Sequence, residues 1–124
     1  MTNARKLTGE AGEHFARAFL ERKGMLHVGS NWRCAAGEID LVMVDGDMLV
    51  FVEVKTRRTN IAGTAEESVS EAKAARLLSA GEWYVSDHPE FEARTWRIDL
   101  VAITMDRYEG IVRISHFENA IASG

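Results

Sequence analysis

The sequence has little of what small proteins use to supplement a core. Its one cysteine, Cys34, excludes an intramolecular disulfide framework and a multi-cysteine zinc site. Its one proline excludes a Pro-rich linker. It has no apolar run near the roughly 20 residues of a membrane-spanning helix, and residues 1–13 are too polar for a signal peptide. We therefore expect a cytoplasmic protein that does not enter a membrane.

An excess of positive charge is also absent, because 15 basic and 19 acidic residues give a net charge of −4. Taken alone, this balance argues against a nucleic-acid binder, which is usually basic. The charge is uneven, with +1 over residues 1–64 and −5 over residues 65–124. The length of 124 residues and the hydrophobic content of 46% suit a single domain, residues 1–124, with a sizeable core.

Periodicity predicts two helices and five strands in the order α-β-β-β-α-β-β. The first helix is expected over residues 9–23, with Thr8 as its N-cap. Ser68 and Glu71 are a candidate capping box for the second helix, in which Gly81 argues against an unbroken run. The central strands are apolar on both faces, which predicts an α/β fold with helices on both sides of the sheet. The strands are expected at residues 25–32, 38–44, 49–56, 96–104 and 111–117.

Three charged residues stand in apolar strands. Glu53 and Lys55 share one face of their strand, because strand side chains alternate between faces. A two-residue turn at residues 45–46 would pair Asp40 with Phe51, and a four-residue loop beginning at the same residue would pair Asp40 with Glu53. Either turn brings Asp40, Glu53 and Lys55 to one face of the sheet.

Two carboxylates on a half-buried face repel each other, and one lysine offsets only part of that cost. A divalent cation would offset it better and would polarise a phosphodiester, while Lys55 would stabilise the charge of the transition state. The alternative is an ordinary salt bridge between Lys55 and either Asp40 or Glu53. Glu13 stands at the edge of the apolar arc of the first helix, where it could point to the same face or pair with Arg17.

The segments GEID (residues 37–40) and FVEVKTR (residues 51–57) together resemble the D…(D/E)-x-K signature of the PD-(D/E)XK, or restriction-endonuclease-like, nucleases. Ile39 stands at the proline position of that signature. Along nearly its whole length, the chain resembles the small bacterial YraN family, a group similar to Holliday-junction resolvases. The resemblance implies an α-β-β-β-α-β core with a mixed central sheet flanked by helices. It extends to Gly12-Glu13, Asn31-Trp32-Arg33, Lys73, Arg97-Ile98-Asp99, His116 and Asn119-Ala120.

The resemblance also implies roles for particular residues. Asp40, Glu53 and the backbone carbonyl of Val54 would bind the metal, Mg²⁺ or Mn²⁺, and Lys55 would be the catalytic lysine. Glu13 would assist the metal, often through water. The implied activity is metal-dependent endonucleolytic hydrolysis of phosphodiester bonds of DNA, including branched or junction DNA. A homodimer would suit the two-fold symmetry of a junction.

Basic residues near the proposed site are candidates for phosphate contacts. Arg33, Arg57 and Arg58 are expected on loops that flank the site, and Lys73 could reach it from the start of the second helix. The alternative for each is a solvated surface charge.

Other notable side chains have structural interpretations first. Asp99 shares a strand face with Arg97 and is expected to pair with it, and His116 is expected to be structural rather than a general base. The tryptophans are expected to pack in the core more than to stack on bases. Two other functions stay open: a non-catalytic nucleic-acid-binding module of the same fold, and a protein-interaction domain favoured by the acidic C-terminal half.

Overall fold

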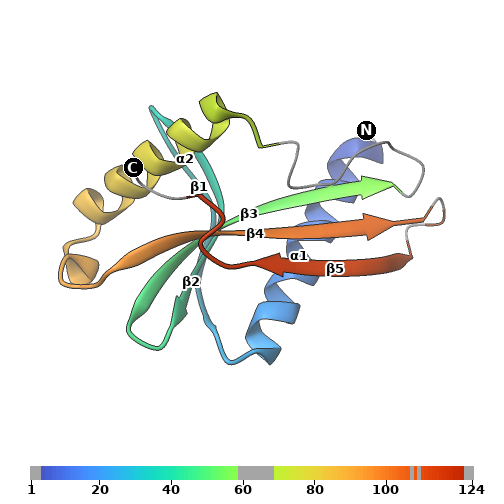
Figure 1. Ribbon diagram of the computed structural model, residues 1–124, viewed down its shortest axis with the longest axis horizontal. Helices are drawn as coiled ribbons and strands as arrows, with labels where there is room; N and C mark the ends of the chain where they lie inside the picture. The colour runs from blue at the N-terminus through green and yellow to red at the C-terminus, as the bar shows by residue number, and fades with distance from the viewer. Residues whose placement is uncertain (1–3, 59–68, 107, 109, 122–124) are drawn as a thin grey trace.

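The computed structural model describes residues 4–58, 69–106, 108 and 110–121 (Figure 1). Within these described ranges, two helices and five strands follow the predicted order, and a short 3₁₀ turn, η2, lies at Pro89–Phe91. The helices are α1 (Ala4–Arg22) and α2 (Glu71–Asp87). The strands are β1 (Leu26–Cys34), β2 (Gly37–Asp45), β3 (Met48–Arg58), β4 (Trp96–Met105) and β5 (Ile111–Phe117).

The five strands form one sheet in the order β1-β2-β3-β4-β5. Strands β3 and β4 run parallel, with α2 in the connection between them, and the other neighbouring pairs run antiparallel. Figure 1 shows β3, β4 and β5 side by side, with α1 behind them. This mixed sheet flanked by helices confirms the predicted fold class, and it is consistent with a restriction-endonuclease-like fold.

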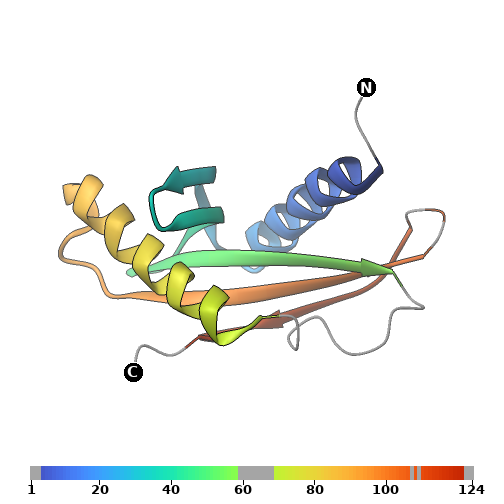
Figure 2. The ribbon, with the colours of Figure 1, turned by 90° about the horizontal axis from the view of Figure 1, so that it is seen from above.

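The two helices cover opposite faces of the sheet, as the two-sided apolar pattern predicts. In β3, Val50 and Val52 belong to the core cluster under α1, whereas Leu49 and Phe51 belong to the cluster under α2. Figure 2, which views β3–β5 nearly edge-on, shows α1 on one side of these strands. A charged side chain in the middle of β3 is therefore covered whichever way it points. Among the described residues, no helix is long and apolar enough to cross a membrane.

Helix α1 begins at Ala4, so Thr8 lies inside it and the predicted N-cap is wrong. The residues before Thr8 include the good helix formers Ala4, Lys6 and Leu7, which explains the earlier start. The helix packs closely on β3, because a Cβ at Gly12 would overlap with Oγ1 of Thr56.

Helix α2 runs unbroken through Gly81, contrary to the expected interruption. A Cβ at Gly81 would lie only 2.7 Å from Cζ3 of Trp96, so the missing side chain lets the helix approach the sheet. The predicted cap residue Ser68 lies outside the described residues. The observed N-cap is Ser70, whose Oγ accepts a hydrogen bond from the Lys73 N–H at 3.1 Å.

The register of the β2–β3 hairpin decides between the two turns that the sequence allowed. Asp45 pairs with Met48, which leaves residues 46–47 as the turn, and Gly46 adopts a φ of 62° there. The register of the second alternative, which aligns Asp40 with Glu53, is therefore confirmed, but the loop is two residues rather than four because Asp45 and Met48 also pair. The alternative pairing of Asp40 with Phe51 is wrong, because Phe51 pairs with Val42.

Candidate active site

Asp40 and Glu53 stand side by side on the two central antiparallel strands. The β2–β3 pairing ends with Leu41 and Val52, and Asp40 and Glu53 are the next residues along the two strands. The Val54 N–H donates a hydrogen bond of 2.8 Å to Oδ2 of Asp40, which fixes that carboxylate against β3. The Glu53 side chain is 4% exposed. The fold therefore holds a buried carboxylate, Glu53, next to a part-buried one, Asp40.

This arrangement is electrostatically costly. Burial and, next, the negative charge of Glu53 raise the pKa of Asp40 from 3.8 to about 7. The hydrogen bond from Val54 acts in the opposite direction, and the charges of Glu13 and Glu38 add smaller increases to the same pKa. Because the negative charge of this site is poorly compensated, a cation bound there would be stabilised.

Two lysines approach the same oxygen of Glu53. Nζ of Lys55 lies 3.5 Å from Oε1 of Glu53, and Nζ of Lys73, from the first turn of α2, lies 3.4 Å from it. Lys73 therefore reaches the site, which settles the alternative between this position and open solvent. The ordinary salt bridge left open by the sequence also exists, between Glu53 and Lys55. Among the described residues, however, no ion pair reaches Asp40, so its charge is not neutralised by either lysine.

Glu13 approaches the site from α1, and its charge interacts with those of Asp40 and Glu53. Its pKa is raised chiefly by burial, and a hydrogen bond with the Asn31 side chain works against that rise. The charge of Glu53 also raises the pKa of Glu13, and that of Glu13 raises the pKa of Asp40. The alternative partner, Arg17, instead pairs with Glu21 at 3.4 Å. Asn31 has a φ of 53°, an uncommon conformation for a residue other than glycine, and its contact with Glu13 was not predicted.

The donors at this site suit a hard divalent cation. In the part of the chain that the structure describes, no group of three or more His, Cys, Asp or Glu side chains could hold a metal ion. The donor set is therefore two carboxylates, with the Val54 carbonyl in the adjacent backbone. Mg²⁺ is commonly bound by one or two carboxylates, with water and substrate phosphate supplying the remaining oxygens. Such an ion would balance the negative charge that burial disfavours at Asp40.

The arginines proposed to flank the site are on strands, not on loops as predicted. Arg33 is in β1, where its Nε lies 3.6 Å from Oε2 of Glu38, and its side chain is 78% exposed. Arg57 and Arg58 end β3, and Nη1 of Arg58 donates to the Asp106 carbonyl at 3.3 Å. By alternation, Arg57 shares the Lys55 face and Arg58 the opposite one. The loops shorten because β1 and β3 each extend two residues past their predicted ends.

Sequence reasoning missed Arg76, which lies on α2 one turn after Lys73. A Cβ added to Gly37 would be 3.9 Å from Cβ of Arg76, so this arginine borders the β1–β2 connection. Its spacing of three residues from Lys73 is the signal that could have found it, since residues three apart are neighbours on a helix surface.

A second polar cluster lies on the other face of the sheet. Asp99 is fully buried and accepts hydrogen bonds from Nε of Arg97 at 2.9 Å and from the Asn119 N–H at 2.9 Å. Nε2 of His116 lies 2.7 Å from Asp99, and Nδ1 of His116 lies 2.7 Å from Nζ of Lys23. The ion pair of Asp99 with Arg97 is thus confirmed. With both ring nitrogens in contacts, His116 has the geometry of a structural histidine.

Two of the three tryptophans pack as expected. Trp32 and Trp96 lie against the core cluster under α2, where Trp96 meets the Phe51 ring edge-on at 5.2 Å between centroids. Trp83 differs, because it is 50% exposed on α2.

The fold and this site define a class: a mixed α/β protein, consistent with a restriction-endonuclease-like fold, that places a buried and a part-buried carboxylate beside two lysines. The chain belongs to the family described as Uncharacterised protein family UPF0102, whose model matches residues 12–103. The matched range contains Glu13, Asp40, Glu53, Lys55 and Lys73.

Relatives named UPF0102 protein resemble the chain over nearly its full length. The protein from Roseiflexus castenholzii is 44% identical over 98% of this chain and 98% of its own. Those from Pelotomaculum thermopropionicum and Ectopseudomonas mendocina are 41% and 42% identical, over 97% and 90% of this chain and 99% and 92% of their own.

Proposed function

We propose that this protein is a metal-dependent endonuclease of the PD-(D/E)XK superfamily that hydrolyses phosphodiester bonds of DNA. The observation that carries the proposal is the position of Asp40 opposite Glu53, with Lys55 on the same strand face. These three residues are the ones that match the D…(D/E)-x-K signature, and they lie close together in the fold. The high pKa of Asp40 shows that the pair is costly without a counter-ion.

The carboxylates of Asp40 and Glu53 and the carbonyl of Val54 would hold Mg²⁺ or Mn²⁺. When bound, such an ion polarises the phosphodiester and lowers the pKa of a bound water. The protein supplies the remaining groups. The Val54 N–H holds the Asp40 carboxylate in place, and the two lysines pair with the Glu53 carboxylate.

Lys55 is the group best placed to meet the phosphate. Its amine lies at the carboxylate pair and, unlike Glu53, is partly open to solvent, with a side chain 30% exposed. A substrate phosphate could therefore accept a hydrogen bond from it, and the amine would stabilise negative charge on the phosphoryl oxygens as the transition state forms. Glu13, held by Asn31, would orient water at the edge of the site.

The remaining contacts with DNA would come from basic side chains around the site. Arg33, Arg57, Arg58 and Lys73 are the proposed phosphate contacts, and Arg76 joins them because it follows Lys73 on the same helix surface. The net charge of the chain is −4, and few basic side chains surround the site. Binding to DNA should therefore be weak without the metal. A homodimer would double this basic surface and would match a two-fold junction.

The test is cleavage of duplex, single-stranded and branched DNA with Mg²⁺ or Mn²⁺. Asp40→Asn and Lys55→Ala should each lower single-turnover cleavage by about 10²- to 10³-fold. Asp47→Asn, in the exposed turn of the same hairpin, removes one negative charge away from the site and should cleave like the wild type. Cleavage of no substrate, or full activity of Asp40→Asn and Lys55→Ala, would refute the proposal. Metal-independent DNA binding without cleavage would favour the non-catalytic module instead.

A further inference from the structure

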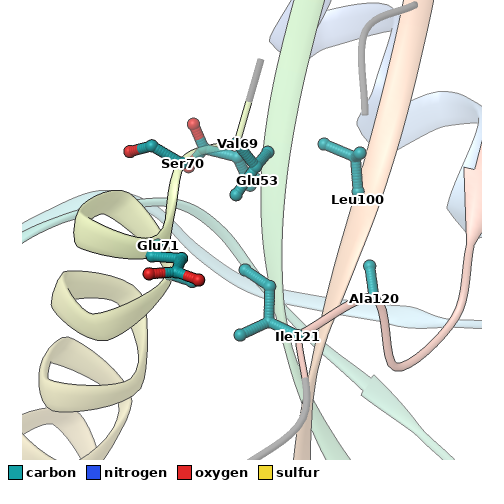
Figure 3. A pocket seen from close by; sticks show the side chains of 8 residues that line it. Glu53, Val69, Ser70, Glu71, Leu100, Ala120 and Ile121 are labelled. Atoms are coloured by element: carbon teal, nitrogen blue, oxygen red, sulfur yellow. The ribbon is translucent and has the colours of Figure 1, made fainter. Parts of the chain in front are cut away.

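A cavity of about 320 Å³ lies directly beside the carboxylate pair (Figure 3). Glu53 belongs to both, because its side chain lines the cavity and also holds Lys55 and Lys73. Figure 3 shows the start of α2 on one side of the cavity, and β4 and the chain after β5 on the other. The lining residues are Glu53, Val69, Ser70, Glu71, Ala74, Leu100, Ala120 and Ile121.

The walls of this cavity are fixed by the fold. Leu100 is the register partner of Glu53 across the parallel β3–β4 pair. The wall after β5 is attached to β4, since the Ala120 N–H donates to the Ile98 carbonyl at 2.8 Å. The preceding Asn119 N–H donates to the buried Asp99 carboxylate. The second polar cluster therefore holds one wall of the cavity from the other face of the sheet.

The lining has a distinct chemistry. Apolar side chains form most of it. The polar groups are the carboxylates of Glu53 and Glu71, which accept hydrogen bonds, and the Ser70 hydroxyl, whose oxygen already accepts from the Lys73 N–H. None of the eight described lining residues is Lys, Arg or His, so the cavity does not suit a second phosphate. The ligand that it suits has apolar faces and N–H donors on its edge. Within a nucleic acid, that description fits a nucleobase and neither the phosphate nor the sugar.

We propose that this cavity receives one unpaired nucleobase of the DNA, next to the phosphodiester at Asp40 and Glu53. The inference rests on the proposed nuclease function and narrows its substrate class. A paired base is stacked in its duplex, and extruding it costs energy that an already unpaired base does not require. The preferred substrate is therefore DNA with an unpaired nucleotide at the point of cleavage, such as a flap, a gap or a branch. Glu71 would accept a hydrogen bond from a base amino group.

The matched variants are Ala74→Leu and Ala75→Leu. Both add the same side chain to α2, but Ala74 lines the cavity whereas Ala75 is exposed and does not line it. Flapped duplexes would carry the fluorescent base 2-aminopurine unpaired, at successive positions around the branch. Binding would be measured without metal, at protein concentrations high enough to saturate the weak metal-free complex. The wild type and Ala75→Leu should raise the fluorescence at one position, because none of the eight described lining residues has an aromatic ring to quench it. Ala74→Leu should abolish that rise and weaken binding by about tenfold.

The outcomes separate this inference from the nuclease proposal. An equal fluorescence response in Ala74→Leu and Ala75→Leu, or no response at any position, would overturn the base site even if the protein cleaves DNA. A response lost only in Ala74→Leu would support the base site even if no DNA is cleaved. If cleavage occurs, Glu71→Gln should reduce the preference for cytosine or adenine over thymine at the responding position, and an unchanged preference would remove Glu71 from base recognition.

Discussion

Asp40 should make the protein less stable as the pH rises, and Asp40→Asn should remove that effect. The pKa of Asp40 is raised from 3.8 to about 7 in the folded state, chiefly by burial and then by Glu53. Between these values the folded protein holds a proton that the unfolded chain has released. The folded state is therefore favoured at low pH, and this contribution is lost as the pH rises through about 7. Asparagine can still accept the Val54 N–H and carries no charge to repel Glu53.

The expected size follows from the two pKa values. The pKa of Asp40 is 3.8 in the unfolded chain and about 7 in the folded protein. Ionisation of Asp40 therefore lowers the free energy of unfolding by roughly 2 to 3 kcal/mol between about pH 5 and about pH 8. Relative to the wild type, Asp40→Asn should therefore gain roughly this amount between the same two pH values. Smaller increments from Glu13 and Glu38 are included in the raised pKa of Asp40.

The assay is urea denaturation of both proteins at the two pH values, with a chelator to keep divalent ions away. Asp47→Asn controls for the loss of one negative charge, since it lies in the exposed turn of the same hairpin. A stability difference between Asp40→Asn and the wild type that does not change with pH would refute the reasoning. A difference that changes in favour of the wild type at high pH would refute it as well.

Three further changes test the packing that positions the site. Gly12→Ala should lower the free energy of unfolding by about 1 to 3 kcal/mol, because the added Cβ would overlap with Thr56. Gly9→Ala, with open space around it, should raise the free energy of unfolding by about 0.5 to 1 kcal/mol. Equal effects of the two substitutions in urea denaturation would contradict the close contact of α1 with β3. Ser70→Ala should cost about 1 kcal/mol by removing the N-cap of α2, and an unchanged melting temperature would count against that cap. Asp99→Ala should cost about 3 to 5 kcal/mol, because the buried His116 ring and the Asn119 N–H lose their acceptor, while Arg97 keeps its ion pair with Asp45. Wild-type stability in denaturant would show that the cluster is dispensable.

Local rules were sufficient for the strand faces of the site. Strand alternation placed Glu53 and Lys55 together, and either even turn added Asp40 to that face. Those rules could not choose the register, because both candidate turns have the same parity. The choice depends on Gly46, which takes a positive φ as the first residue between the paired Asp45 and Met48.

Contacts between distant elements could not be predicted from one sequence. Lys73 meets Glu53 only because α2 packs across β3, and Asn31 meets Glu13 only because β1 and α1 come together. The cavity depends on Ile121, from the chain beyond the last strand, lying beside α2. None of these positions follows from periodicity, which reports the buried face of an element and not its neighbour.

The most direct test of the account is a crystal structure of the protein soaked in Mn²⁺, with the ion located by its anomalous scattering. The account predicts a peak contacted by the carboxylates of Asp40 and Glu53 and by the Val54 carbonyl, and no such peak in Asp40→Asn. A wild-type crystal at saturating Mn²⁺ that shows no peak at this carboxylate pair, with both lysines still on Glu53, would contradict it.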